Sequence, residues 1–141
     1  MEEHQRTMTK KELAIALHDK KYNCAQAVAC AFAEEIGADP ALLFQACEGF
    51  GLGMGGMEGT CGAISGAVML AGLKNSDGNL ETPATKAATY QLSREIVDRF
   101  RERNQATKCK DLKGVETGCA LRSCPGCIED AVEIVQEVLG L

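Results

Sequence analysis

The chain has 141 residues, a formal net charge of −5 and an apolar fraction of 45% that includes no Trp. This length suits one domain with one hydrophobic core. The acidic balance, without Lys- or Arg-rich runs, argues against nucleic-acid binding. The longest nearly apolar run, residues 61–73, is too short to span a membrane, and the first residues are acidic rather than apolar. We therefore expect a cytoplasmic protein that does not bind membranes.

The first half of the chain carries three helix-start signals, each a polar N-cap residue followed by apolar residues at helical spacing. The third signal also has proline at the first helical position. The sequence thus predicts helices in this half rather than strands. The caps are Thr9, Asn23 and Asp39, and the predicted helices run over residues 10–20, from 24 to the stop at Gly37, and from 40 to about 47.

Between residues 49 and 62, seven of the fourteen residues are glycine. This content is too costly in backbone entropy for a regular helix and predicts a loop with unusual backbone angles. Residues 51–56 formally match G-x-G-x-x-G, but a dinucleotide site also needs a preceding strand and a βαβ unit, and neither is indicated. We interpret the loop as wrapping a sulfur site with its backbone amides.

Three further helices are predicted in the second half of the chain, with an irregular, cysteine-containing segment before the last one. The expected fold is all-α: a single-domain compact helical bundle of about five to six helices over residues 1–141, with a glycine-rich loop and with residues 1–8 as a frayed N-terminus. The three helices are expected over residues 61–73, from Thr82-Pro83 to about Asn104, and from Ser123-Cys124-Pro125 onward.

Eight cysteines in a chain without a secretory signal point to metal binding or redox chemistry rather than to structural disulfides. Cys24, Cys61 and Cys124 stand at or beside predicted helix starts, where amide N–H groups and the helix dipole lower a thiol pKa. Cys30 lies about 240° around the helix from Cys24, so we interpret it as a packing residue. Cys47 stays open, with a structural role favoured.

Cys124 and Cys127 form a C-x-x-C, a spacing that suits a disulfide or a shared metal ion. No strand is indicated before Cys124, which disfavours a thioredoxin-like fold. Cys109 and Cys119 lie in the irregular segment, where loop placement suits ligands. His4 and His18 do not follow a C-x-x-C, so we expect no haem.

The motifs occur in an order that resembles the C_GCAxxG_C_C family of redox-active proteins. The resemblance spans about residues 23–139 and implies a small prokaryotic protein with four characteristic cysteines. The motifs that carry it are Asn23-Cys24-Ala25-Gln26-Ala27-Val28, Gly51-x-Gly53-Met54-Gly55, Cys61-Gly62-Ala63-x-x-Gly66, Cys109-x-x-Leu112-x-Gly114 and Cys124-x-x-x-Ile128-x-x-Ala131.

The resemblance implies a site at Cys24, Cys61, Cys109 and Cys124. Our first hypothesis is that these four bind an iron–sulfur cluster for electron transfer or redox sensing, with Gly62 among the cofactor-binding residues. Cys127 lies one helical turn from Cys124 and stays open as an alternative to it as the last ligand. Two alternatives stay open: metal-free thiol–disulfide exchange with Cys124 and Cys127 as catalytic residues, and a structural zinc site on the same four cysteines. We expect a redox partner protein. The small-residue helix faces suit a homodimer and a monomer's core equally.

Overall fold

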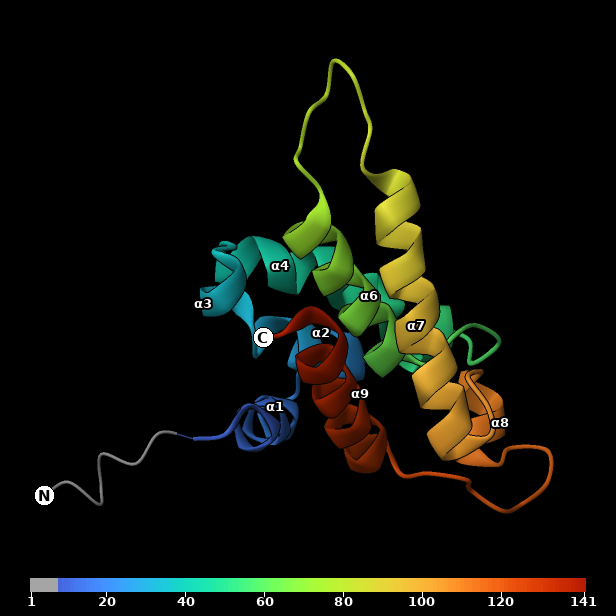
Figure 1. The fold of residues 1–141 in the computed structure, drawn as a ribbon. Coiled ribbons are helices and arrows are strands. Elements are labelled where there is room, and N and C mark those ends of the chain that lie inside the picture. The colour runs from blue at the N-terminus through green and yellow to red at the C-terminus, as the bar shows by residue number, and fades with distance from the viewer. Residues whose placement is uncertain (1–7) are drawn as a thin grey trace, which may run out of the picture.

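The computed structural model describes residues 8–141, so all but Met8 of the expected frayed N-terminus lies outside the described residues. Within this part, the only β feature is an isolated bridge between Thr60 and Lys108, and the all-α fold is confirmed. The helices are α1 (Lys10–Asp19), α2 (Cys24–Cys30), α3 (Ala33–Ile36), α4 (Pro40–Cys47), α5 (Gly51–Met54), α6 (Gly62–Asn75), α7 (Lys86–Asn104), α8 (Cys109–Lys113) and α9 (Cys124–Leu139), with a 3₁₀ turn at Glu48–Phe50 (Figure 1).

The predicted N-caps of α1, α2 and α4 and the predicted start of α9 are confirmed. The Thr9 hydroxyl accepts the Glu12 N–H and the Glu12 carboxylate accepts the Thr9 N–H, which completes a capping box. Asn23 and Gln26 form the same reciprocal pair at α2. Such caps are worth about 1 kcal/mol each. Asp39 and Ser123 cap α4 and α9 with their side chains.

The bundle contains more helical segments than the five to six expected. The single helix expected from residue 24 to Gly37 is divided into α2 and α3, because the chain leaves helical geometry at Phe32, which has φ −109° and ψ 12°. Phe32 is fully buried, so burial of its ring accompanies the break. The one-turn helices α5 and α8 account for the remaining difference.

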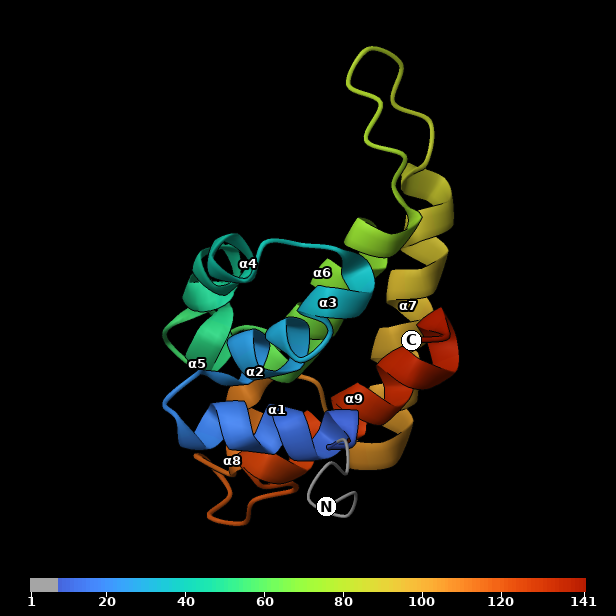
Figure 2. The same cartoon turned by 90° about the vertical axis from the view of Figure 1, so that its left-hand side faces the viewer.

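The longest helix begins later than expected. The cap-and-proline signal at Thr82-Pro83 predicted a start there, but α7 starts at Lys86. The Asn79 side-chain oxygen accepts the N–H groups of Glu81 and Thr82, which holds this stretch in a turn and outside the helix. Residues 76–85 form a loop that projects from the body of the protein (Figures 1 and 2), with Leu80 90% exposed near its middle.

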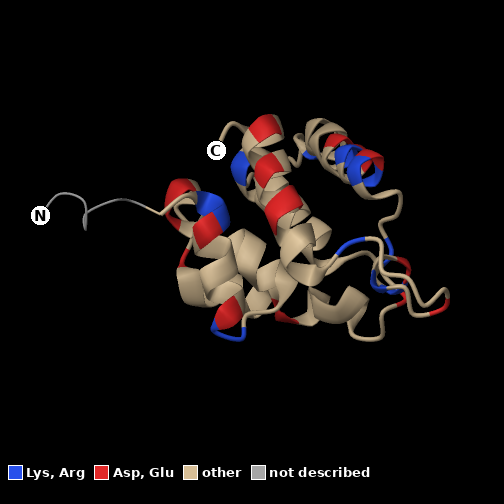
Figure 3. Ribbon diagram, turned by 90° about the horizontal axis from the view of Figure 1, so that it is seen from below, with Lys and Arg blue, Asp and Glu red and all other residues tan. Residues whose placement is uncertain are grey.

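Helix α2 lies at the centre of the bundle and packs against α1, α4, α6 and α9. It carries no charged residue, and residues 25–29 are all buried. Figure 3 shows that the charged residues gather instead on α1, α7 and α9. The core is therefore built around one short apolar helix that the other helices enclose. No helix within residues 8–141 has the length and apolar character needed to cross a membrane.

Helices α2 and α6 approach each other backbone to backbone. A Cβ placed on Gly66 would lie 2.5 Å from the carbonyl oxygen of Ala25, and one on Gly62 would lie 3.3 Å from the Ala25 nitrogen. No side chain can occupy the Gly66 position without moving one of the helices. The glycines of the Cys61-Gly62-Ala63-x-x-Gly66 motif thus place the N-terminal end of α6 beside that of α2.

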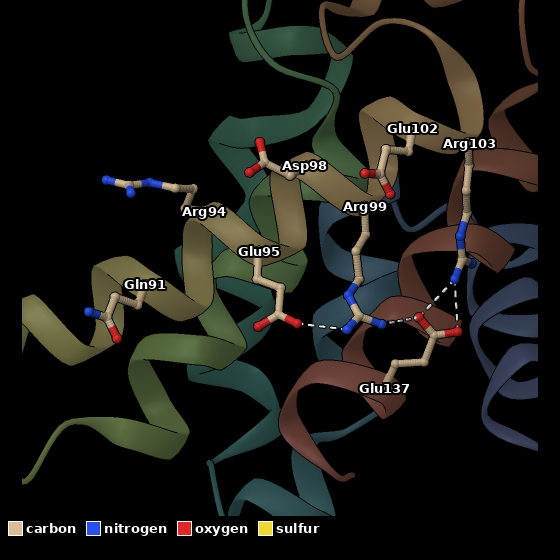
Figure 4. Close-up of a pocket in the computed structure, with 8 residues that line it drawn as sticks. All are labelled: Gln91, Arg94, Glu95, Asp98, Arg99, Glu102, Arg103 and Glu137. Atoms are coloured by element: carbon tan, nitrogen blue, oxygen red, sulfur yellow. Dashed lines mark hydrogen bonds and ion pairs between the residues drawn. The ribbon is translucent and has the colours of Figure 1, made fainter.

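On the outside, α7 and α9 are joined by ion pairs. Arg99 lies between Glu95 of its own helix and Glu137 of α9, with distances of 2.7 and 2.9 Å, and Arg103 binds Glu137 at 2.8 Å (Figure 4). The hydrogen bond from Arg103 is the largest cause of the lowered pKa of Glu137. These exposed charges compensate one another, so we assign this surface a structural role.

Replacing Gly66 by Ala should destabilise the protein, because the added methyl group overlaps the Ala25 carbonyl. We expect Gly66→Ala to lower the free energy of unfolding by about 1–3 kcal/mol. Gly72→Ala is the matched control in the same helix, since a Cβ there meets no atom within 4 Å, and it should be neutral or slightly stabilising. Urea denaturation followed by circular dichroism measures both. Equal stabilities of the two variants would contradict the close packing.

Candidate functional site

Five of the eight cysteines line one cavity of about 210 Å³, to which α1, α2, α5, α6, α8 and α9 contribute. The cavity contains the four cysteines indicated by the motifs and one more, Cys127. Cys30, Cys47 and Cys119 do not line it; Cys47 is fully buried and Cys119 is exposed in a loop. The lining residues are His18, Asn23, Cys24, Leu52, Cys61, Gly62, Cys109, Leu112, Lys113, Arg122, Cys124 and Cys127.

Each thiol of the cavity stands at the N-terminal end of a helix. Cys24, Cys109 and Cys124 are the first residues of α2, α8 and α9, Cys61 is the N-cap of α6, and Cys127 lies one turn into α9. The helix starts predicted for Cys24, Cys61 and Cys124 are therefore confirmed. Backbone N–H groups without a helical partner are concentrated at such ends, and the helix dipole favours negative charge there.

Cys61 and Cys127 form the more buried of two thiol pairs. The hydrogen bond from the Cys127 thiol is the largest cause that lowers the pKa of Cys61 despite its burial, and the backbone N–H groups of Ala63 and Ile64 at the start of α6 lower this pKa further. The same shared proton, together with burial, raises the pKa of Cys127. Within this pair, negative charge is therefore favoured on the Cys61 sulfur, and the proton is favoured on Cys127.

Cys24 and Cys124 form the second pair. The Cys24 thiol donates to Cys124, and this hydrogen bond is the largest cause that lowers the pKa of Cys124 to about 5. Lys113 adds to the effect, since its Nζ lies 3.4 Å from the Cys124 sulfur. The hydrogen bond to Cys124 and burial raise the pKa of Cys24. Cys124 is consequently a thiolate at neutral pH, and Cys24 remains protonated.

The glycine-rich loop packs directly on Cys109. The Cys109 N–H donates to the Gly59 carbonyl at 2.9 Å, and a Cβ on Gly53 would lie 2.4 Å from the Cys109 Cβ. Leu52 and Gly53 both have left-handed backbone angles, with φ of 55°, so the unusual backbone expected of this loop is confirmed. Burial raises the pKa of Cys109. Close packing against Cys109 therefore explains the glycine at position 53.

The segment between α8 and α9 is fixed at both of its ends. Gly114 adopts φ +72°, and a Cβ there would lie 2.4 Å from the Cys119 carbonyl carbon. Arg122 pairs with Asp130 at 3.1 Å, and its guanidinium covers Gly126, where a Cβ would meet it at 2.6 Å. These contacts hold the first turn of α9, and with it Cys124 and Cys127, against the cavity.

The donor chemistry of the cavity fits a thiolate-bound metal or cluster. Five thiols from four helices face one space, with apolar walls at Leu52 and Leu112 and with helix N-termini behind the sulfurs. Within residues 8–141, no group of three or more His, Cys, Asp or Glu side chains has the arrangement of a metal site. The sulfurs are arranged instead as two hydrogen-bonded pairs.

The structure assigns partners to the C-x-x-C cysteines that the motif alone did not indicate. The largest interaction of Cys124 is with Cys24 of α2, and that of Cys127 is with Cys61 of α6. Lys113 was also missed. Its spacing of four residues after Cys109 would place the two side chains on one helix face, but the segment was not expected to be helical.

Comparison with known proteins identifies one family. The model of the family described as "Putative redox-active protein (C_GCAxxG_C_C)" matches residues 22–138, most of the chain. No curated protein matches the chain, and no solved structure matches it. The matched range includes all five cysteines of the cavity.

The lowered pKa of Cys124 predicts selective alkylation of the reduced, metal-free protein. At pH 6 to 7 Cys124 is a thiolate and should react rapidly with iodoacetamide, with a rate that falls only as the pH approaches about 5. Cys30 is the control, because it is also half-buried but burial raises its pKa. Peptide mass spectrometry after timed alkylation measures both rates. A Cys124 rate that increased only above pH 8, as for an ordinary thiol, would contradict the assignment.

Proposed function

The chain belongs to the C_GCAxxG_C_C family, described as redox-active, and on this basis we propose that its redox site is the five-cysteine cavity, which binds an iron–sulfur cluster for electron transfer or redox sensing. One observation carries the proposal: five thiols from four helices converge on one cavity. A dithiol mechanism needs only two sulfurs, whereas iron–sulfur clusters are usually held by four thiolates. The excess of convergent sulfur therefore favours the cluster.

The proposed ligands are Cys24, Cys61, Cys109 and Cys124. When bound, the cluster would supply reversible one-electron chemistry. The chain's own contribution is to deliver thiolates and to stabilise their charge: Cys61 stands at the N-terminal end of α6, where the backbone N–H groups of Ala63 and Ile64 lower its pKa. Gly62 lets the start of α6 lie against the start of α2, since a Cβ there would lie 3.3 Å from the Ala25 nitrogen. Hydrogen bonds to ligand sulfurs tune a cluster's potential.

The first test is the content of iron, acid-labile sulfide and zinc in protein purified without oxygen, with a visible spectrum before and after dithionite. We expect iron and sulfide in similar amounts and a visible band that dithionite bleaches. Cys61→Ser should lose most of the iron, because it removes a proposed ligand that lines the cavity and whose pKa is lowered.

Cys119→Ser is the matched control, since Cys119 is exposed and does not line the cavity, and it should retain the wild-type iron content. Stoichiometric zinc without colour or redox activity would replace the cluster by a structural zinc site on the same cysteines. A colourless protein without metal would contradict both metal proposals.

The Cys24–Cys124 pair supports a second candidate function, metal-free thiol–disulfide exchange. The Cys124 thiolate would attack a substrate disulfide and form a mixed disulfide with one half, while the other half leaves as a thiolate. Cys24 would then attack the Cys124 sulfur, release the remaining substrate half and leave a Cys24–Cys124 disulfide; the Cys24 proton goes to a leaving thiolate. Two protein thiols are oxidised and one substrate disulfide is reduced.

If exchange uses this pair, we expect Cys24, rather than Cys127, to resolve the mixed disulfide on Cys124. After treatment with oxidised glutathione, Cys24→Ser should accumulate a glutathione adduct on Cys124, because the thiol that hydrogen-bonds Cys124 is missing. Cys127→Ser is the matched control and should form the intramolecular disulfide as the wild type does. Intact-mass and peptide mass spectrometry distinguish the products. Adduct accumulation in Cys127→Ser alone would assign resolution to the C-x-x-C motif instead.

In either case we expect a redox partner protein in the cytoplasm. Leu52 lines the cavity and is 50% exposed, so we place the exchange of electrons or thiols at this part of the surface. The small-residue faces of α2 and α6 that suited a homodimer are buried against each other. Their packing supports a role within the core of one chain.

A further inference from the structure

Lys113 brings a positive charge into contact with the cysteine cluster. Its Nζ lies 3.4 Å from the Cys124 sulfur, and it lines the cavity. We propose that Lys113 is a positioning residue that sets the reduction potential of the cysteine site by stabilising its electron-rich, negatively charged state. This inference rests on the proposed function, namely that the cavity is the redox site, but it holds for a cluster and for a dithiol alike.

The fold holds Lys113 in this position through one helical turn. Cys109 and Lys113 are the first and last residues of α8, four positions apart, so that the thiol and the ammonium group reach the same cavity. Gly114 ends the helix in a left-handed conformation, and its N–H donates to the Asp111 carbonyl. Lys110 of the same helix reaches Glu58 and Glu116 instead, at 3.4 and 3.2 Å.

The charges around the cavity make Lys113 the effective cation of the site. His18, Lys113 and Arg122 are the basic residues that line it, and its lining includes no carboxylate. The charge of Arg122 is balanced by Asp130 at 3.1 Å. The charge of Lys113 faces sulfur instead: its Nζ lies 3.4 Å from the Cys124 sulfur, and Cys24 and Cys109 line the same cavity.

The direction of the effect follows from electrostatics. Reduction of a cluster adds one electron, and reduction of a disulfide by two electrons produces sulfurs that can carry negative charge. A cation in contact with sulfur stabilises the reduced state more than the oxidised state, so it raises the reduction potential in both cases. Loss of the ammonium group should therefore make the site harder to reduce.

The test compares the reduction potential of four forms of the full chain: wild type, Lys113→Met, Lys113→Arg and Lys110→Met. Iron-loaded protein is titrated optically with dithionite and mediators; if the protein contains no iron, the dithiol is equilibrated with glutathione buffers and analysed by mass spectrometry. We expect Lys113→Met to shift the reduced-to-oxidised ratio at least tenfold toward the oxidised form, which is 59 mV for one electron or 29.6 mV for two.

Lys113→Arg keeps the charge and should stay within about threefold of the wild-type ratio. Lys110→Met removes a charge from the same helix, but away from the cavity, so its reduced-to-oxidised ratio should also stay close to that of the wild type. Three outcomes would overturn the proposal. The first is equal reduction potentials in the wild type and Lys113→Met. The others are a shift in Lys110→Met, or in Lys113→Arg, that equals the shift in Lys113→Met. A wild-type protein with no measurable couple by either route would overturn the proposed function, and this inference with it. Circular dichroism verifies that each variant is folded.

Discussion

The backbone contact between α2 and α6 is the constraint on which the site depends. Gly66 faces the Ala25 carbonyl with no space for a side chain, so the two helices pack at the smallest separation that their backbones allow. Because Cys24 begins α2 and Cys61 caps α6, this contact also sets where two of the five thiols lie. The positions of α8 and α9 complete the cavity, but they are arranged around a pair of helix ends that glycine has already brought together.

Hydrogen bonds between thiols limit the negative charge around the cavity, because two sulfurs share one proton. Full ionisation of five neighbouring thiols would place several negative charges in a small, partly apolar space, which is electrostatically unfavourable. The structure instead pairs Cys61 with Cys127 and Cys24 with Cys124, so that one thiol of each pair donates to the other sulfur and lowers the pKa of that sulfur. Cys61 stands at the N-terminal end of α6, and Lys113 contacts Cys124. Each sulfur with a lowered pKa thus has its own source of positive potential.

Local rules were enough to predict much of this arrangement. The caps at Thr9, Asn23 and Asp39 depend on a few neighbouring residues, and so do the helix starts that carry Cys24, Cys61 and Cys124. The break at Phe32 and the start of α7 at Lys86 were not predictable in this way, because burial of a ring and an Asn79 turn overrode propensity. The pairing of Cys127 with Cys61 and the contact of Lys113 with Cys124 join segments far apart or helices too short to show a periodic pattern. Both contacts depend on tertiary packing, and the spacing of residues in one sequence does not predict which distant segments pack together.

The loop at residues 76–85 follows the C-terminal end of α6, whereas Cys61 precedes the N-terminal end, so about 20 Å of helix separates the loop from the cysteine cavity. Its backbone makes local turns and Leu80 is almost fully solvated. Lengthening a loop of this kind costs little chain entropy, and exposed loops tolerate insertion better than packed elements. This end of the molecule is therefore the natural place for an affinity tag, a fluorophore or a surface tether, because the attachment would leave the sulfur chemistry at the other end undisturbed.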